Sequence, residues 1–322
     1  MTFAHPTLLD IVQSHTNVSI DDIRFRPIRT GKHNRSYWVE VEDTARYVLR
    51  IAPPDDAGFL FYERRMMRQE PALHHLIQQH TEIPIAEVVG YDFERNHIDR
   101  DYVLMSVLPG TPLSEISQMH DGARRRTLRQ VGRYLRQLHD LTATAHMGQR
   151  RYGYLGEHHP MSPASTWVEA FETMWNALLD DVVACGSYNQ QEAQFMRELF
   201  QTLRSAFERP VEPRLLHMDI WAQNILVNPT GDVTGLVDFD RALWGDVEIE
   251  FAVLDYCGIS EPSFWEGYGC ARDTSEAAMI RRQFYLLYEI QKYMPIRVWR
   301  QDDPGGARQY KYQSFRMARA LM

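Results

Sequence analysis

Four polar side chains in the second half of the chain have the types and spacing of a site for phosphoryl transfer. His217 and Asp219 are separated by one residue, and Asn224 follows five residues after Asp219. Asp238 comes later and begins an Asp-Phe-Asp triplet. A carboxylate beside a hydroxyl can accept its proton, and an amide oxygen with a second carboxylate suits Mg²⁺, which prefers hard oxygen ligands. The set predicts transfer of the γ-phosphoryl group of ATP, with Asp219 as catalytic base and Asn224 and Asp238 as magnesium ligands.

The sequence between the two expected metal ligands supports this site, because it has the pattern of a β-hairpin. Residues 225–227 and 233–237 are apolar and β-prone, and the residues between them, NPTGD, are typical of a turn. Asn224 and Asp238 lie at equal distances on either side of Gly231, so a hairpin places them opposite one another. Two oxygen ligands then meet at one cation.

Length and composition predict a globular protein with room for two lobes. The chain has 322 residues, of which 44% are hydrophobic and 24% are charged, and these are ordinary values. The net charge of −8 argues against nucleic acid as a main partner, because phosphate backbones are bound by basic surfaces. Cys185, Cys257 and Cys270 form neither a C-x-x-C pair nor a zinc-binding pattern.

The sequence also predicts a cytoplasmic protein without a membrane partner. The first 20 residues lack the basic start and the long apolar block of a signal peptide. No run of residues approaches the ~20 apolar residues that a membrane span needs. The few cysteines are compatible with a reducing compartment. The sequence leaves the oligomeric state open.

The order of the predicted elements indicates an α+β fold with two lobes. After a short helix, the first part of the chain is rich in strands, which are expected at residues 37–41, 47–51, 86–91 and 102–107, with helical sequence at 61–80. Beyond Gly110 the pattern becomes helical, with helices expected around 128–138, at 167–183 and 190–207, and from Ile280 to Met294, where Pro295 ends the last one. A junction near residues 106–110 divides the chain into an N-terminal lobe, 1–107, and a C-terminal lobe, 108–322.

This layout and these residues resemble the aminoglycoside phosphotransferase and choline kinase-like superfamily. The family's segment H-x-D-x-x-x-x-N and the metal-binding Asp of its next strand are matched here by His217, Asp219, Asn224 and Asp238. The resemblance covers roughly Ile28 to Tyr256. It implies the bilobal protein-kinase fold, with ATP bound between a small β-rich lobe and a larger α-rich lobe. Residues 245–250 resemble a later family element, G-D-x-x-x-D/E, in which Val247 and Glu250 depart from the common pattern.

The resemblance further implies which backbone groups contact the nucleotide. The segment TGKHNRSY looks like the family's phosphate-binding turn, so Gly31 and Asn34 are expected beside the phosphates. The segment LMSVLPG resembles the hinge between the lobes. There, backbone groups are expected to pair with the adenine edge at Ser106, Val107 and Leu108.

A cation and a carboxylate of the N-terminal lobe complete the implied ATP site. Arg50 falls where kinases place a lysine that contacts the α- and β-phosphates, and a guanidinium can bind phosphate through two hydrogen bonds. Glu70 is expected to orient Arg50. Glu63 is the alternative, because Pro71 places Glu70 at the start of a helix rather than within it.

Other residues of the C-terminal lobe have roles that the sequence suggests with less detail. His217 is expected to brace the catalytic loop. Asp240 is expected to assist the metal, or else to pair with Arg241 or to cap the strand. The acceptor site is expected on the larger lobe, where carboxylates beside aromatic rings suit an amine-bearing or sugar-like ligand. The residues of this kind are Asp255, Tyr256, Trp265 and Glu266.

The predicted activity is therefore transfer of phosphate from ATP to a hydroxyl of a small molecule. An aminoglycoside or related antibiotic, an amino sugar, choline or ethanolamine, a fructosamine and a homoserine-like metabolite all remain open as acceptors. One alternative is a nucleotide-binding pseudokinase or regulatory module, against which the complete set of Asp219, Asn224 and Asp238 stands. Another is a protein kinase, against which the missing A-P-E segment and the short distance from Asp238 to Cys257 stand.

Overall fold

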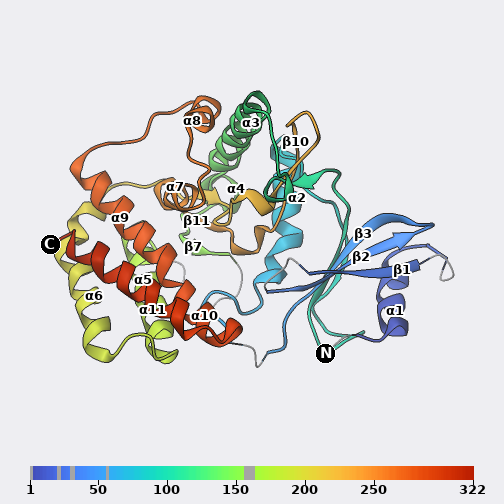
Figure 1. Ribbon diagram of the computed structural model, residues 1–322, viewed down its shortest axis with the longest axis horizontal. Coiled ribbons are helices and arrows are strands. Elements are labelled where there is room, and N and C mark those ends of the chain that lie inside the picture. The colour runs from blue at the N-terminus through green and yellow to red at the C-terminus, as the bar shows by residue number, and fades with distance from the viewer. Residues whose placement is uncertain (1–2, 20–22, 30–32, 56–57, 156–163) are drawn as a thin grey trace.

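The structure, a computed structural model, describes residues 3–19, 23–29, 33–55, 58–155 and 164–322. A twisted sheet near the N-terminus lies at one end of the molecule, and a group of helices that includes the C-terminus lies at the other (Figure 1). Among the described residues, none of the helices is long and apolar enough to cross a membrane. The mixed architecture confirms the predicted α+β fold with a β-rich N-terminal part and a helical C-terminal part.

The N-terminal part is a five-stranded antiparallel sheet in the order β1-β2-β3-β5-β4. Its strands are β1 Ile23–Ile28, β2 Arg35–Val41, β3 Thr44–Ile51, β4 Val88–Asp92 and β5 Tyr102–Ser106. Helix α1, His5–His15, packs on it through Leu8, Ile11 and Val12. Each predicted strand is present, and β1 was not predicted. The β2–β3 turn consists of Glu42 and Asp43, both at positive φ, which is the backbone of a tight two-residue hairpin.

A second element, α2, Glu70–His80, stands between the sheet and the helical part (Figure 1). It follows a 3₁₀ turn, η2 Met66–Gln69, and Pro71 lies in its first turn. The buried side chains Leu73 and Ile77 belong to the same apolar core as residues of the helical part, such as Leu128 and Ile225. Because α2 is fixed to this core, Glu70 at its first turn is held close to the catalytic segment.

The C-terminal part is built from helices around two small three-stranded sheets, β10-β9-β6 and β7-β11-β8. The helices are α3 Asp121–Asp140, α4 Ala143–Met147, α5 Trp167–Ala184, α6 Gln190–Leu203, α7 Val247–Tyr256, α8 Pro262–Tyr268, α9 Glu276–Gln291, α10 Tyr293–Gln301 and α11 Pro304–Arg319. The strands are β6 Thr111–Pro112, β7 Gly153–Tyr154, β8 Arg214–Leu216, β9 Ile225–Val227, β10 Val233–Leu236 and β11 Leu243–Gly245. Short 3₁₀ turns are η3 Leu113–Glu115, η4 Arg204–Phe207, η5 Ala222–Asn224 and η6 Phe239–Arg241.

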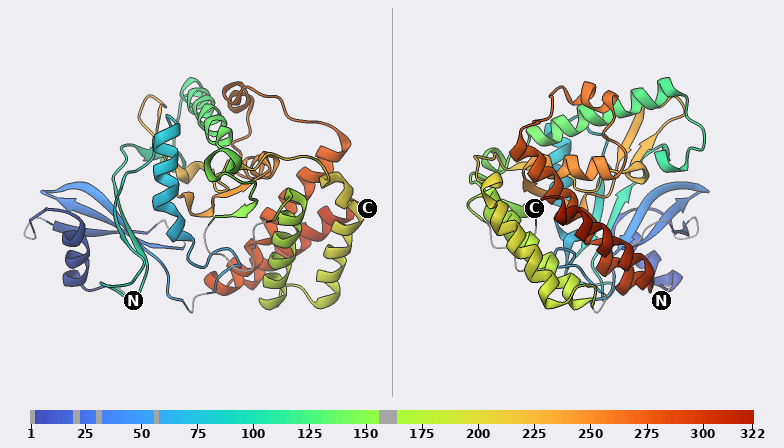
Figure 2. Two further views of the ribbon diagram at one scale, coloured as in Figure 1. Left: turned by 180° about the vertical axis from the view of Figure 1, so that it is seen from behind. Right: turned by 60° about the vertical axis from the view of Figure 1, so that its left-hand side comes forward.

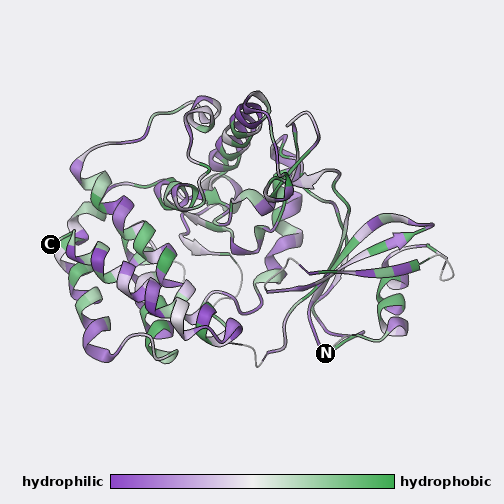
Figure 3. Cartoon of the chain, in the orientation of Figure 1, coloured by the Kyte–Doolittle hydropathy of each residue, from purple (hydrophilic) through white to green (hydrophobic). Residues whose placement is uncertain are grey.

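The helices pack through apolar faces that the sequence pattern marks. Helix α3 is largely hydrophilic in Figure 3, yet its buried residues, Leu128, Val131, Leu135 and Leu138, follow the predicted helical spacing. Seen from behind, α5 and α6 lie beside α9, α10 and α11 (Figure 2). Together they enclose an aromatic core around Phe171 and Phe284.

The end of the chain differs from the prediction. The helix expected to continue to Met294 and to end at Pro295 is α9, which ends at Gln291. A new helix, α10, begins at Tyr293 and contains Pro295 in its first turn. Proline is tolerated there because its missing N–H is not needed in the first turn of a helix. The proline therefore marks a helix start, and the break precedes it.

Asp181 on α5 connects the helical part to the loop before η2. Its Oδ2 accepts a hydrogen bond of 2.8 Å from the Phe61 N–H. Burial, together with the charges of Glu63 and Asp180, raises the pKa of Asp181 to about 6 from an ordinary value of 3.8. The folded protein therefore holds this proton more tightly than the unfolded chain. The contribution of Asp181 to the free energy of unfolding should fall as the pH rises through this window and stay low above it.

Replacing Asp181 with asparagine should remove this pH dependence, because an amide keeps an acceptor oxygen for Phe61 and carries no charge. We expect the Tm of the variant, relative to wild type, to rise as the pH goes from about 4 to about 7. Asp43→Asn is the control, since Asp43 forms an exposed ion pair with Arg24. A constant Tm difference across the pH range would contradict the assignment.

Candidate active site

The catalytic loop connects β8 to β9 and has an uncommon backbone. Met218 lies at φ 66°, in the left-handed region that residues other than glycine rarely adopt. This turn directs Asp219 toward Asn224, whose Nδ2 donates to the Asp219 backbone oxygen at 2.9 Å and to its Oδ2 at 3.0 Å. The His217 ring nitrogen Nε2 lies 3.1 Å from the Val237 carbonyl oxygen, so His217 connects the loop to the hairpin. This geometry agrees with the expected bracing role of His217.

Glu250 fixes the backbone of the catalytic loop at His217 and Met218. Its Oε2 accepts from the His217 N–H at 3.1 Å, and its Oε1 accepts from the Met218 N–H at 2.7 Å. His139 Nε2 lies 2.8 Å from Oε2, and the glutamate is fully buried. Although burial alone raises the pKa of Glu250, its hydrogen bond from His139 and the charge of that ring hold this pKa below the ordinary value. The glutamate that departs from the common family pattern is therefore an ionised anchor for the loop.

Replacing Glu250 with glutamine should destabilise the protein. A glutamine has one acceptor oxygen, and its NH₂ group would face an N–H of either His217 or Met218. One buried donor then loses its partner, which costs about 1–3 kcal/mol. We expect a lower Tm and a lower kcat. Glu266→Gln is the matched control, because Glu266 forms an exposed ion pair with Arg129. Equal Tm values for the two variants would contradict the anchoring role.

The predicted hairpin follows the loop, but its register differs from the prediction by one residue. Strands β9 and β10 pair antiparallel with a bulge between Val233 and Gly235. The Val237 N–H donates to the Asn224 carbonyl at 3.1 Å, so Val237 rather than Asp238 lies opposite Asn224. Asp238 lies directly after this contact at φ 71°. The hairpin thus brings Asn224 and the Asp238 segment together. Because the Asn224 amide nitrogen is bonded to Asp219, its Oδ1 is left as an oxygen ligand for a cation.

Arg50 on β3 joins the sheet to this segment through three carboxylates. Its Nη1 lies 2.8 and 2.7 Å from the two oxygens of Glu70, and its Nη2 lies 2.7 Å from Asp238 Oδ1 and 3.0 Å from Asp240 Oδ2. The structure therefore pairs Arg50 with Glu70. The alternative, Glu63, instead accepts from the Leu60 N–H and pairs with Arg300.

These carboxylates crowd one another. Burial and the charge of Asp240 raise the pKa of Asp238 to about 7, and Arg50 opposes this shift. Burial raises the pKa of Glu70 to about 7 and that of Asp240 to about 6, and the charge of Arg50 opposes both shifts. Such a cluster is short of positive charge and is suited to receive a further cation.

The oxygen atoms of Asn224 and Asp238 suit Mg²⁺ better than they suit a metal ion that is coordinated by protein side chains alone. Among the described residues, no three His, Cys, Asp or Glu side chains are grouped so that they could hold a metal ion. Mg²⁺ is commonly bound by one or two carboxylates together with waters and substrate phosphates. Asn224 and Asp238 supply this kind of incomplete site.

The nucleotide-contact residues predicted in the N-terminal part are placed as follows. Gly31 lies outside the described residues. Asn34 donates from Nδ2 to Asp240 Oδ2 at 3.2 Å, so its turn is tied to the catalytic segment. The Ser106 N–H donates to the Glu87 carbonyl and the Val107 N–H to the Arg46 carbonyl. These two N–H groups serve the sheet. At Ser106 and Val107, only the carbonyl oxygens are therefore left for the expected pairing with adenine. The backbone of Leu108 forms no hydrogen bond with the backbone of another described residue, so both of its groups are left.

Three charged residues that the sequence did not connect with Asp219 support this expected base. Arg241 Nη1 lies 3.2 Å from Asp219 Oδ1, and Arg241 Nη2 lies 3.3 Å from Glu289 Oε2. Lys292 pairs with the same Glu289. Burial would raise the pKa of Asp219, but the charges of Arg241 and Lys292 hold it below its ordinary value. Asp219 is therefore kept ionised, with each carboxylate oxygen held by a different donor.

Arg241 does not pair with Asp240, which was one of the roles expected for that aspartate. Asp240 is bonded to Arg50 and Asn34, and its assistance to the metal stays a prediction. The guanidinium of Arg241 lies over the ring of Tyr62, 5.4 Å from its centroid. The one sequence feature that could have indicated a role for Arg241 at the site is its position directly after the Asp-Phe-Asp triplet. No local pattern marked Glu289 or Lys292.

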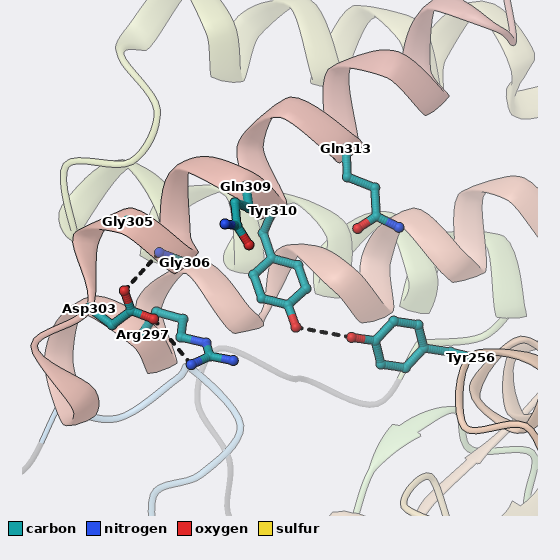
Figure 4. Close-up of a pocket in the computed structure, with 8 residues that line it drawn as sticks. All are labelled: Tyr256, Arg297, Asp303, Gly305, Gly306, Gln309, Tyr310 and Gln313. Atoms are coloured by element: carbon teal, nitrogen blue, oxygen red, sulfur yellow. Dashed lines mark hydrogen bonds and ion pairs between the residues drawn. The ribbon is translucent and has the colours of Figure 1, made fainter.

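The expected acceptor residues do not form an acidic site. Asp255 is bound by Arg272 at 2.8 Å and by Arg282 at 2.9 Å, and Glu266 is bound by Arg129. These arginines neutralise both carboxylates. Trp265 packs edge-on against Phe251. Tyr256 lines a pocket, where its hydroxyl lies 3.1 Å from that of Tyr310 (Figure 4).

Comparison with known proteins agrees with this geometry. The model of the phosphotransferase enzyme family matches residues 24–280, so the chain belongs to this family. A probable ketoamine kinase of Vibrio parahaemolyticus is 25% identical over 265 residues, which cover 81% of this chain and 82% of that protein. A probable ketoamine kinase of Enterococcus faecium is 24% identical over 267 residues, which cover 81% and 85%.

Solved structures show the same fold. A Thermobifida fusca protein that carries the provisional name fructosamine-3-kinase superposes with a TM-score of 0.68 at 18% identity, over 99% of each chain. The gentamicin–APH(2″)-IIa complex gives a TM-score of 0.67 at 13% identity, over 99% of this chain and 97% of that one. Family and relatives together define the protein as an enzyme, a small-molecule kinase. The predicted resemblance is confirmed, and a regulatory module without turnover is not favoured.

Proposed function

We propose that the enzyme transfers the γ-phosphoryl group of ATP, with Mg²⁺, to a hydroxyl of a small ketoamine. The observation that carries the reaction is the position of Asp219. Its carboxylate is kept ionised by Arg241 and is fixed by Asn224 beside the hairpin that bears Asp238. A base, a metal ligand pair and a phosphate-binding cation therefore belong to one connected set of side chains.

Each residue has a part in this reaction. Asp219 orients the acceptor hydroxyl and accepts its proton as the oxygen–phosphorus bond forms. Asn224 and Asp238 would hold Mg²⁺, which neutralises charge on the phosphate oxygens when bound. Arg50, held by Glu70, would contact the nucleotide phosphates. Because little covalent chemistry falls to the protein, positioning and electrostatics supply most of the acceleration.

The relatives favour a ketoamine as the acceptor. The charges beside the base do not discriminate between acceptors, because Arg241 and Lys292 are balanced by Glu289 and by Asp219 itself. The relatives named as ketoamine kinases support a sugar-derived acceptor with a single amine.

The acceptor class is tested by measuring kcat/KM with Mg²⁺ and ATP. The panel is the ketoamine formed from glucose and glycine, kanamycin, glucosamine, choline and homoserine. We expect the ketoamine to give the highest value and kanamycin to give little turnover. Turnover of kanamycin above that of the ketoamine would overturn this acceptor class, although it would leave the phosphotransferase reaction in place.

A further inference from the structure

A pocket of about 460 Å³ opens where the end of α7 faces α10 and α11 (Figure 4). Its walls include two tyrosines, two glutamines and one ion pair, contributed by Tyr256, Arg297, Asp303, Gln309, Tyr310 and Gln313. The tyrosine hydroxyls face each other across the space between the helices. A volume of this size accommodates a small substituent of a ligand.

Contacts connect this pocket to the catalytic aspartate. Tyr310 stacks on Tyr293 with ring centroids 5.0 Å apart, and Tyr256 lies 5.6 Å from the same ring. Tyr293 directly follows Lys292, which pairs with Glu289. Glu289 in turn holds the arginine that contacts Asp219. These contacts link two walls of the pocket, Tyr256 and Tyr310, through Tyr293 to the residues that support Asp219.

The polar groups of the pocket favour an anion. Asp303 is already used: its Oδ2 accepts from Arg297 at 3.1 Å, and its Oδ1 accepts from the Gly306 N–H at 2.8 Å. Arg297 donates to Asp303 from Nη1, and its side chain is 37% exposed, so other guanidinium N–H groups remain for a ligand. The first turn of the 16-residue helix α11, including Gly305, lines the same pocket and adds its positive dipole end.

The aromatic faces give the same indication. Arg297 lies 6.0 Å from the centroid of the Tyr310 ring, which lines the pocket. One of the two aromatic rings in the pocket wall is therefore already paired with a cation of the protein. A cationic group is disfavoured here, and a carboxylate meets an accessible guanidinium.

We propose that this pocket binds a carboxylate on the nitrogen substituent of the acceptor, with Arg297 as its main partner. This inference rests on the proposed function, because it assumes a ketoamine whose sugar lies at Asp219. It identifies the preferred acceptors as ketoamines of amino acids rather than of simple amines. Tyr256 and Tyr310 form the walls beside the substituent, and Gln309 and Gln313 provide amides at its edge.

The test uses two ligands that differ by the carboxylate alone. These are the ketoamine of glucose with glycine and the ketoamine of glucose with methylamine. Their Kd values are measured by calorimetry in the presence of ADP and Mg²⁺, so the readout does not depend on turnover. Wild type should bind the glycine ligand about 10-fold more tightly than the methylamine ligand, as for a charged hydrogen bond. In Arg297→Gln the ratio of the two Kd values should fall to about 1.

The control variant is Arg316→Gln, an exposed arginine later in α11 and outside the pocket lining. It should keep the wild-type ratio. A ratio near 1 in wild type, or an unchanged ratio in Arg297→Gln, would overturn the carboxylate pocket while leaving the kinase proposal intact. Failure of both ligands to bind wild type that still binds ADP and Mg²⁺ would overturn the pocket and the ketoamine class together. The phosphotransferase reaction would then be tested with the other acceptors.

Discussion

Replacing Asp219 with asparagine should lower kcat by about 10³-fold, within the range measured for loss of a general base. The change is nearly isosteric, and one amide oxygen remains to accept from either Asn224 or Arg241. In the proposed mechanism, nucleotide binding depends on Arg50, Asn224 and Asp238, none of which is replaced in this variant. We therefore expect a nearly unchanged Kd for ADP with Mg²⁺, together with a far-UV spectrum like that of wild type.

The paired measurement of kcat and nucleotide Kd separates catalysis from folding. Asn224→Asp tests the other side of the contact, because a second carboxylate 3.0 Å from Asp219 Oδ2 would replace a donor by a like charge. It should reduce kcat and also change Mg²⁺ dependence. An Asp219→Asn enzyme that keeps more than about a tenth of the wild-type kcat would exclude Asp219 as the base.

The second large effect is expected from Asp238→Asn. Asp238 is the one charged group of the proposed metal pair, so its neutralisation weakens the charge stabilisation that Mg²⁺ provides. A loss of several kcal/mol corresponds to a fall in kcat of about 10²–10³-fold. The fold should persist, because Arg50 keeps its contacts with Glu70 and Asp240. The Mg²⁺ concentration for half-maximal activity should rise in the same variant.

Asp240→Asn is the matched control for that experiment. Asp240 lies two residues later and is only 5% exposed, and its Oδ2 accepts from Arg50 and Asn34. An amide oxygen can still accept one of these bonds. We expect a modest loss of kcat without a change in Mg²⁺ dependence. If the Mg²⁺ concentration for half-maximal activity rose more in Asp240→Asn than in Asp238→Asn, Asp240 rather than Asp238 would be the metal ligand.

The catalytic hairpin was predictable because its ligands are close in sequence. Turn chemistry at Asn228–Asp232 and the apolar runs on either side predict the hairpin. The bulge between Val233 and Gly235 then shifts its register by one residue. Arg50 and Glu70 were matched by resemblance, and the structure shows why the pair forms: Pro71 starts α2 at the position that places Glu70 against Arg50. Their contact with the nucleotide stays a prediction.

The surroundings of the base could not be predicted in the same way. Arg241, Glu289 and Lys292 meet through the packing of α9 against the catalytic segment, over a separation of about fifty residues that carries no periodic signal. The expected negative charge of the acceptor residues was wrong for a related reason, whereas their place in the acceptor site stays a prediction. Asp255 and Glu266 look available in the sequence, but arginines from other helices neutralise them. Ion pairing across helices depends on tertiary packing, which composition does not reveal.

The most direct test of the central claim is phosphorus NMR of a reaction containing the enzyme, ATP and the glycine ketoamine, with and without Mg²⁺. The account predicts a phosphate monoester signal that grows with the ADP signal, needs Mg²⁺ and is nearly absent with Asp219→Asn. Release of inorganic phosphate alone, or an ester that forms at the wild-type rate in the variant, would contradict it.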